Sequence, residues 1–283
     1  MSIKTKIQWC DSTKNPTMGC EGCELWNSKV KKCYAGKMHV HYGGATKGFS
    51  PTFEELTFWP GRMEKAARWS DLAGTERDDK PWLNGLPRLI FVSDMSDSLS
   101  SSVPFEYLDD EIIHNVTSPH GRRHCWLWLT KRPDRMARFS TWLANRGVRW
   151  PVNLWAGTSI TTQSTTSRIS HLLQVGDKDT IHFLSVEPQW ESVDLTRWLR
   201  RLDWIIQGGE SGQGATPFDI DWAVELKQVC EEYRIPYFLK QLGTFVVRNG
   251  ERVKFADHHA GKWDEWLEEL RVRQMPEALY YQN

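Results

Sequence analysis

The chain has 283 residues, with 36 basic and 36 acidic side chains, six cysteines and no formal net charge. This length is above the usual size of one domain but suits one α/β barrel. The balanced charge excludes a global field that would draw the chain to nucleic acid or anionic lipid, so any such contact must come from a local patch. Because there is no apolar run of 18 residues and no signal-peptide pattern, we expect a cytoplasmic protein without a membrane partner.

The N-terminal part of the chain is organised around a cysteine loop. Period-two alternation predicts a first strand over residues 3–9, which leads into a loop over residues 10–40. Cys20, Cys23 and Cys33 lie in that loop at C-x2-C-x9-C spacing, beside Gly19 and Gly22. Residues 53–69 have helical spacing, and residues 70–86 form a polar surface insertion.

From residue 88 onward, short apolar strands alternate with amphipathic helices. We predict strands at 89–92, 124–129, 153–156, 181–186, 204–207 and 237–239, and helices at 103–116, 133–145, 162–174, 194–201 and 219–234. Such alternation predicts a parallel sheet, and seven strands favour a partial or closed TIM-type (β/α) barrel over an open doubly wound sheet. A small hairpin around Asn249-Gly250 and a helix over 262–273 complete a single domain, residues 1–283.

The three loop cysteines leave three interpretations open. With His39 or His41 as a fourth ligand, they form a structural zinc site. Without a fourth ligand, three thiolates hold a 4Fe-4S cluster and leave one iron open to a substrate or cofactor. Alternatively, they are buried free thiols that pack as small hydrophobes. The isolated Cys10, Cys125 and Cys230 are expected to be such packed thiols.

Polar residues follow every predicted strand, at the end where barrel enzymes place their active sites. They are Ser93, Asp94 and Asp97 after the second strand, Lys131 after the third, Thr158 and Ser159 after the fourth, Glu187 after the fifth, Gly209 and Glu210 after the sixth, and Lys240 after the seventh. One interpretation is a ring of salt bridges at the barrel mouth. The other is a polar cavity that binds a zwitterionic cofactor and a substrate.

Two further features bear on nucleic acid. Six basic residues form one dense segment, which is either a solvated helix face or a track for a phosphate backbone: Arg122, Arg123, Lys131, Arg132, Arg135 and Arg138. Most of the 16 tryptophans lie in strand-like runs and are expected in the core, while a few could stack on bases.

The motifs at the strand ends also carry a family resemblance. They are Asn15-Pro16 with Gly19-Cys20, Cys33-Tyr34-Ala35, Phe91-Val92 with Met95-Ser96-Asp97, Leu129-Thr130-Lys131-Arg132-Pro133, Phe183-Leu184-Ser185 with Glu187-Pro188, Gly208-Gly209-Glu210-Ser211-Gly212, and Phe238 with Lys240-Gln241. Through them the chain resembles a largely uncharacterised three-cysteine family, common in phages and prophages, that is similar to radical S-adenosylmethionine (SAM) enzymes. The usual cysteine spacing of those enzymes is C-x3-C-x2-C, which differs from the spacing here.

The resemblance implies a radical-SAM-like partial barrel with a 4Fe-4S cluster on Cys20, Cys23 and Cys33 and SAM on the open iron. It implies an external electron donor and a 5'-deoxyadenosyl radical that takes a hydrogen atom from the substrate. We assign six residues to the SAM pocket: Ser93, Thr158, Ser159, Glu187, Gly209 and Glu210. Lys131 and Lys240 are expected to face the substrate as catalytic residues.

The expected substrate is a nucleic acid or a nucleotide. A radical reaches unactivated carbon such as the thymine methyl group, so the most specific hypothesis is modification or isomerisation of a thymine substituent in phage DNA hypermodification. The alternative is a zinc-stabilised nucleic-acid-binding module without catalysis. A metal-free barrel enzyme with Lys240 as a Schiff-base lysine is a third hypothesis.

Overall fold

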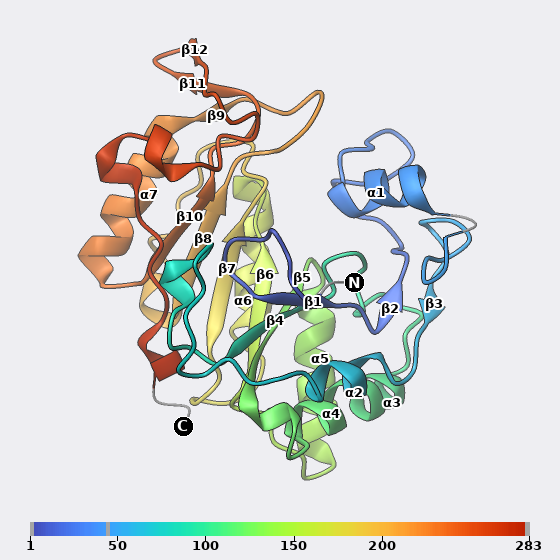
Figure 1. Ribbon diagram of the computed structural model, residues 1–283. Helices are drawn as coiled ribbons and strands as arrows, with labels where there is room; N and C mark the ends of the chain where they lie inside the picture. The colour runs from blue at the N-terminus through green and yellow to red at the C-terminus, as the bar shows by residue number, and fades with distance from the viewer. Residues whose placement is uncertain (1–2, 44–45, 281–283) are drawn as a thin grey trace. The chain divides into compact units, whose positions relative to one another are not determined.

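The computed structural model describes residues 3–43 and 46–280 (Figure 1). Its main element is a seven-stranded sheet with the strand order β1-β4-β5-β6-β7-β8-β10. These strands are Ser12–Lys14, Arg88–Val92, His124–Thr130, Leu154–Ser159, His182–Val186, Trp204–Gly208 and Tyr237–Gln241. The sheet is parallel and alternates with helices along the chain, so the fold is α/β and consistent with a partial TIM-type barrel.

Seven α-helices and two small sheets complete the described fold. The helices are α1 Tyr34–Tyr42, α2 Arg62–Ala67, α3 Phe105–Leu108, α4 His114–Thr117, α5 Pro133–Asn145, α6 Arg168–Leu172 and α7 Ile220–Tyr233. β2 (Thr17–Met18) pairs with β3 (Thr57–Phe58), and β11 (Val246–Arg248) lies between β9 (Phe218–Asp219) and β12 (Glu251–Val253). In the described part of the chain, no helix is long and apolar enough to cross a bilayer.

The chain divides into two compact units. Unit 1 comprises residues 1–75, 85–156 and 174–180, and unit 2 comprises residues 76–84, 157–173 and 181–283. β1, β4 and β5 lie in unit 1, β7, β8 and β10 lie in unit 2, and the boundary falls within β6, after Ala156. The single-domain organisation expected from the sequence stays a prediction.

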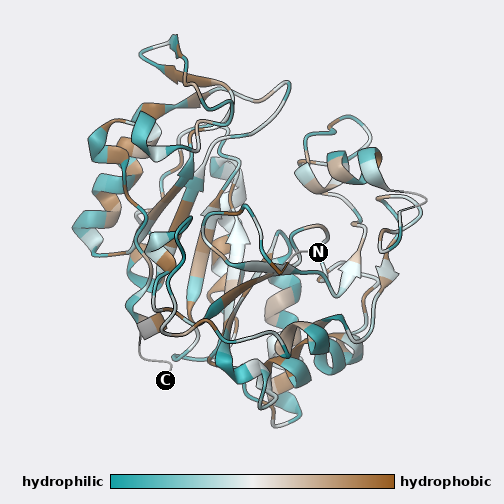
Figure 2. Ribbon diagram, in the orientation of Figure 1, coloured by the Kyte–Doolittle hydropathy of each residue, from teal (hydrophilic) through white to brown (hydrophobic). Residues whose placement is uncertain are grey.

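Each unit has a core of buried strand residues. All five residues of β4 are buried, and Cys125, Trp126 and Trp128 of β5 have no exposed surface. Figure 2 shows hydrophobic residues along β4. The indole of Trp126 donates a 3.0 Å hydrogen bond to the Gly121 carbonyl, which allows this polar group to be buried. The prediction that most strand tryptophans belong to the core is confirmed for this strand.

Most elements after residue 88 follow the predictions, because their apolar periodicity is strong. β4, β5, β7, β8, β10 and α7 agree within a few residues, and α5 has the predicted bounds. The hairpin turn is also confirmed, since Asn249 and Gly250 have φ angles of 53° and 77°, as a two-residue turn requires.

Five element predictions are wrong in type or length. Residues 3–9 form turns, and the first strand is instead the polar β1, because the Ser12 hydroxyl accepts a 2.9 Å hydrogen bond from Arg88 that permits its burial. Residues 53–69 contain the short β3 and α2 in place of one helix, since Pro60 and Gly61 interrupt the helical spacing. The helices expected over 162–174, 194–201 and 262–273 are short: α6 with a 3-10 turn at Gln163–Ser167, and 3-10 turns at Leu199–Arg201, Trp263–Glu265 and Glu268–Leu270.

His124 predicts an acid-sensitive step in the stability of unit 1. Its side chain is fully buried, and its Nε2 atom lies 3.0 Å from the Ala67 carbonyl, to which it donates when neutral. Burial lowers the pKa of His124 to about 4 from an ordinary value of 6.5. The unfolded chain therefore binds the proton first, and we expect roughly 3 kcal/mol of unfolding free energy to be lost as the pH falls from 6.5 to 4.

Urea unfolding at pH 7, 6, 5 and 4 measures this step. His124→Gln should show a smaller loss of unfolding free energy over that range than the wild type, and His171→Gln, which removes an exposed histidine, should follow the wild type. The same pH dependence in all three proteins would contradict the assignment.

Candidate functional site in the cysteine loop and at the strand ends

The cysteine loop of unit 1 is fixed by backbone hydrogen bonds at each cysteine. The Cys20 amide donates to the Phe53 carbonyl at 2.7 Å, and Cys23 and Trp26 exchange two hydrogen bonds of 2.9 and 3.0 Å. The Cys33 amide donates to the Leu25 carbonyl at 2.9 Å, and Cys33 is the N-cap residue of α1. The backbone at each of the three cysteines is therefore held in a defined position.

Two glycines make this loop conformation accessible. Gly19 and Gly22 directly precede the first two cysteines and have φ angles of 88° and 92°. A Cβ atom at Gly19 would lie 1.9 Å from the Glu55 carbonyl oxygen, and one at Gly22 would lie 2.4 Å from the Trp26 carbonyl oxygen. Only glycine combines this φ with so close an approach of two backbones.

Two of the three thiols pack against a buried apolar cluster. Cys20 and Cys33 pack against a buried cluster formed by Met18, Trp26, Ala35, Phe53 and Met95. Burial raises the pKa of the Cys20 thiol to about 12, and the nearby Asp97 carboxylate adds to that rise. Burial also raises the pKa of the Cys23 thiol, while the Lys131 ammonium group acts in the opposite direction. The neutral thiol is therefore the stable form until a cation replaces the proton.

The three thiols are electrostatic neighbours but are not drawn together around one point. A charge on Cys23 raises the pKa of Cys20, and a charge on Cys33 raises that of Cys23. Among residues 3–43 and 46–280, no three side chains of the types His, Cys, Asp and Glu lie in an arrangement that would hold a metal ion. The donor chemistry nevertheless fits a thiolate-bound metal or cluster, because three cysteines share one loop, two of them pack against one apolar cluster, and Arg132 lies beside them.

The cationic flank comes from the end of β5. The Arg132 guanidinium donates a 2.9 Å hydrogen bond to the Gly22 carbonyl, and its charge opposes the rise in the pKa of the Cys20 thiol. It also lies 3.6 Å from the Glu21 carboxylate and 4.0 Å from that of Asp97. Arg132 therefore contacts the loop directly. The residue belongs to the Leu129-Thr130-Lys131-Arg132-Pro133 motif, but the sequence analysis did not predict this contact. Lys131, expected to face the substrate, follows β5 directly, and its charge opposes the rise in the pKa of the Cys23 thiol.

The segment after β4 forms hydrogen bonds with the same loop. The Asn15 amide group donates to Asp94 and accepts a 2.9 Å hydrogen bond from the Met95 amide. Ser93, a residue expected to contact SAM, has a φ of 74°, and its hydroxyl lies 2.8 Å from that of Ser98. A non-glycine residue in this region stores backbone strain, which is common at functional sites.

His39 is the buried histidine of this region. Its side chain is 4% exposed and packs against the rings of Phe49 and Phe53. Neither of its ring nitrogens has a hydrogen-bond partner within the described residues. His41, the other histidine considered as a zinc ligand, is exposed and packs against Tyr42.

In unit 2, the strand ends carry a partly buried ion pair. The Lys240 ammonium group at the end of β10 donates a hydrogen bond to the Glu187 carboxylate, which follows β7. A Cβ atom at Gly208 would lie 3.3 Å from the Glu187 carboxyl carbon, so a glycine leaves room for this pair. The salt-bridge interpretation of the strand ends is thus realised for these two residues. Thr158 and Ser159, at the end of β6, are buried.

Glu210 stabilises the loop that follows β8 through hydrogen bonds. Its carboxylate accepts hydrogen bonds from the Trp190 indole at 3.0 Å and from the Thr216 amide and hydroxyl at 3.1 and 2.9 Å. A Cβ atom at Gly209 would lie 2.1 Å from the Leu242 carbonyl oxygen. The close approach expected at Gly209 therefore involves this chain's own backbone, and the assignment of both residues to SAM stays a prediction.

The basic segment over residues 122–138 is largely used within the protein. Besides Arg132, Arg135 donates to the Val103 carbonyl and lies over the Phe105 ring, and Arg138 pairs with Asp134 at 3.0 Å. Arg123 donates to the carbonyls of His120 and Trp69. These contacts favour the solvated-face interpretation over a track for phosphates.

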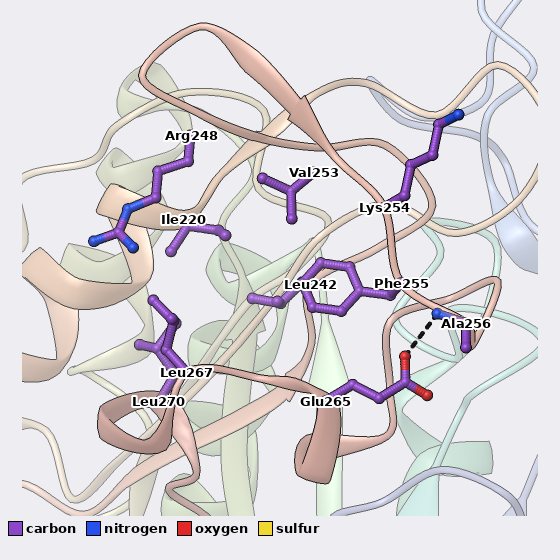
Figure 3. Close-up of a pocket in the computed structure, with 10 residues that line it drawn as sticks. All are labelled: Ile220, Leu242, Arg248, Val253, Lys254, Phe255, Ala256, Glu265, Leu267 and Leu270. Carbon is purple, nitrogen blue, oxygen red and sulfur yellow. Dashed lines mark hydrogen bonds between the residues drawn. The ribbon is translucent and has the colours of Figure 1, made fainter.

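Unit 2 also contains an apolar cavity of about 360 Å³, near the hairpin (Figure 3). Its lining residues are Ile220, Leu242, Arg248, Val253, Lys254, Phe255, Ala256, Glu265, Leu267 and Leu270. The Glu265 carboxylate accepts a 2.7 Å hydrogen bond from the Ala256 amide at its edge. None of the residues expected to bind SAM or substrate lines this cavity.

The comparisons with known proteins place the chain in a family without assigning a reaction. A family model described as a protein of unknown function (DUF5131) matches residues 4–276. The chain belongs to this family. No curated protein and no solved structure matches it significantly. The matched region, residues 4–276, includes the cysteine loop and all seven strands of the sheet.

Gly19 gives a stability prediction for the cysteine loop of this DUF5131 protein. Gly19→Ala should cost about 3 kcal/mol or more, because it adds a collision with the Glu55 carbonyl to the strain of a left-handed φ. Gly61→Ala is the matched control, since Gly61 has a φ of 78° and a Cβ atom there meets nothing within 4 Å. It should cost about 1 kcal/mol. Urea unfolding compares the two, and equal losses would refute the close contact.

The Glu187–Lys240 pair gives a second prediction, testable by a double-mutant cycle. Glu187→Gln, Lys240→Met and the double variant should show a coupling of about 1 to 2 kcal/mol in unfolding free energy, because the side chains are only 15% and 20% exposed. Additive losses would show that the pair contributes nothing to stability.

Proposed function

We propose that this chain is a radical SAM enzyme whose cluster is held by Cys20, Cys23 and Cys33. The observation that carries the proposal is the cysteine loop: three thiols lie in one loop, two of them pack against one apolar cluster, two glycines at positive φ shape the loop, and Arg132 is bonded to it. A closed structural zinc site needs four protein ligands, whereas three thiolates leave one position of a 4Fe-4S cluster for a cofactor. When bound, a reduced cluster supplies the electron that cleaves SAM into methionine and a 5'-deoxyadenosyl radical.

The protein's own residues have three tasks in this proposal. Met18, Trp26 and Phe53 keep water from the sulfurs, which strengthens electrostatic interactions at the site. Arg132 and Lys131 balance the negative charge that three thiolates bring. Thr158, Ser159, Glu187, Gly209, Glu210 and Ser93 remain the residues assigned to SAM, and Lys131 and Lys240 those assigned to the substrate.

Within this proposal, the substrate is a nucleobase, and the reaction modifies or isomerises a thymine substituent in phage DNA hypermodification. The support is chemical: an unactivated carbon on a base resists acid–base chemistry at neutral pH, and a radical reaches it. The base would leave the helical stack to meet the radical unless the strand is single. The reducing electron would come from an external donor.

His39 favours a second candidate, a zinc-stabilised nucleic-acid-binding module. A buried histidine with no hydrogen-bond partner in the described chain offers a ring nitrogen of the kind that binds zinc. In that case three cysteines and His39 would form a closed structural site, and no catalysis would follow.

Metal content and SAM cleavage together test the two candidates. After anaerobic reconstitution we expect about four irons per chain and formation of 5'-deoxyadenosine from SAM with dithionite as reductant. Cys20→Ala, Cys23→Ala and Cys33→Ala should each abolish both signals. Cys230→Ala, which removes a buried thiol in α7, should retain them. About one zinc per chain with no iron and no 5'-deoxyadenosine would support the zinc module and exclude the radical enzyme.

A further inference from the structure

The apolar cavity of unit 2 has a buried floor and an open side (Figure 3). Ile220, Leu242 and Leu270 line it and are 3%, 1% and 0% exposed. Leu267 lines it as well and is 38% exposed, so the cavity opens to solvent beside this residue. Ligand sites in proteins have volumes of roughly 300 to 1,000 Å³ and mostly apolar walls. A cavity of about 360 Å³ with these walls has the properties of a ligand site.

Hydrogen bonds around the cavity hold its walls in place. The Glu265 carboxylate accepts a 2.7 Å hydrogen bond from the Ala256 amide, which fixes the segment after β12 (Figure 3). The Trp266 indole and the Leu242 amide both donate to the Ala260 carbonyl, at 2.9 and 3.0 Å. These bonds join the hairpin segment, the end of β10 and the turn before Leu267. The cavity is therefore preformed, and a ligand does not have to open it.

The composition of the walls favours an aliphatic ligand. Five of the ten lining residues are isoleucine, leucine or valine, and Phe255 is the one aromatic residue among the ten. Water against such walls lacks hydrogen-bond partners, so a ligand that displaces it gains affinity. A planar base would find one ring to stack on, whereas a flexible alkyl chain can contact every branched side chain of the wall.

The charged residues at the edge of the cavity favour an anionic end group on that chain. Lys254 is exposed, and its ammonium group forms no ion pair within the described residues. Its flexible four-carbon stem lets this group turn toward a ligand at the edge. Arg248 already lies 3.6 Å from Asp221, and the Glu265 carboxylate is bonded to the Ala256 amide. The group at the edge that is free to bind a ligand is therefore the cation of Lys254.

We propose that this cavity binds a free medium-chain fatty acid, with its alkyl chain against the leucines and its carboxylate beside Lys254. The inference goes beyond the proposed function, because it involves neither the cysteine loop nor the residues assigned to SAM. Leu242 relates the two sites, since it directly follows β10, which contains Lys240. Its carbonyl oxygen would lie 2.1 Å from a Cβ atom at Gly209. A bound chain thus contacts the segment that continues from the strand end.

Isothermal titration calorimetry of the full chain with sodium octanoate, decanoate and dodecanoate, each below its micelle concentration, tests the inference. Affinity should rise about fourfold for each added CH2 group until the cavity is filled, because each group leaves water. Binding should have a negative heat-capacity change. Octan-1-ol should bind about tenfold more weakly than octanoate, since it lacks the charge that pairs with Lys254.

Two variants with matched controls locate the ligand. K254Q should weaken octanoate binding about tenfold and leave octan-1-ol binding unchanged. R252Q removes a neighbouring cation of β12 that does not line the cavity, so it should bind both like the wild type. Leu267→Asp places a like charge at the open side and should weaken dodecanoate binding at least about tenfold. Val152→Asp, at a 60% exposed position of unit 1, should bind dodecanoate like the wild type.

Three outcomes would overturn the inference. The first is no heat of binding with any of the three acids. The second is wild-type binding in both K254Q and Leu267→Asp, which would place the acid elsewhere on the chain. The third is binding to vesicles of phosphatidylglycerol without binding of the free acids, which would show that this face meets a membrane surface. Calorimetry reads binding directly, so none of these outcomes depends on whether the chain cleaves SAM.

Discussion

The cysteine loop depends on one buried carboxylate, that of Asp97. The Thr130 hydroxyl lies 2.9 Å from both oxygens of this carboxylate and shares its one proton between them, and the Lys131 amide donates to it at 3.1 Å, so Asp97 joins the ends of β4 and β5. It also lies 4.0 Å from the Arg132 guanidinium, which donates to the Gly22 carbonyl of the cysteine loop. A carboxylate that is 8% exposed is tolerated only because it is surrounded by donors. The position of the thiols in unit 1 is thus set through the sheet.

Glu21 extends this network from the other side of the loop. Its carboxylate accepts hydrogen bonds of 2.8 and 3.0 Å from the Ser101 and Ser102 amides. Burial opposes ionisation of Glu21, but these amide donors prevail and lower its pKa to about 2. The carboxylate therefore stays charged across the physiological range and remains a partner for Arg132. Alternating negative and positive groups, Asp97, Arg132 and Glu21, hold a loop that has little regular structure of its own.

Unit 2 uses its strand-end charges differently. Glu187 and Lys240 neutralise each other, and Glu210 ties down the loop after β8 through Trp190 and Thr216. These contacts give the polar strand ends a structural use, and they are compatible with a catalytic one, because preorganised groups cost little reorganisation when a ligand arrives. A cofactor that binds here would compete for partners that are already in place, which makes Glu187 and Lys240 the most informative residues to exchange.

The sequence by itself determined the parallel α/β architecture, α5, α7, the hairpin turn and the grouping of three cysteines, because apolar periodicity, turn chemistry and cysteine spacing are local properties. It did not determine β1, whose buried polar residues depend on Arg88 and other distant partners, nor the short turns over residues 262–273. Only the tertiary structure decided that Arg132 contacts Gly22 in the cysteine loop, that Asp97 joins two strands, and that Tyr34 is exposed. These features depend on contacts between residues far apart in the chain, and such contacts cannot be predicted from the pattern of neighbouring residues.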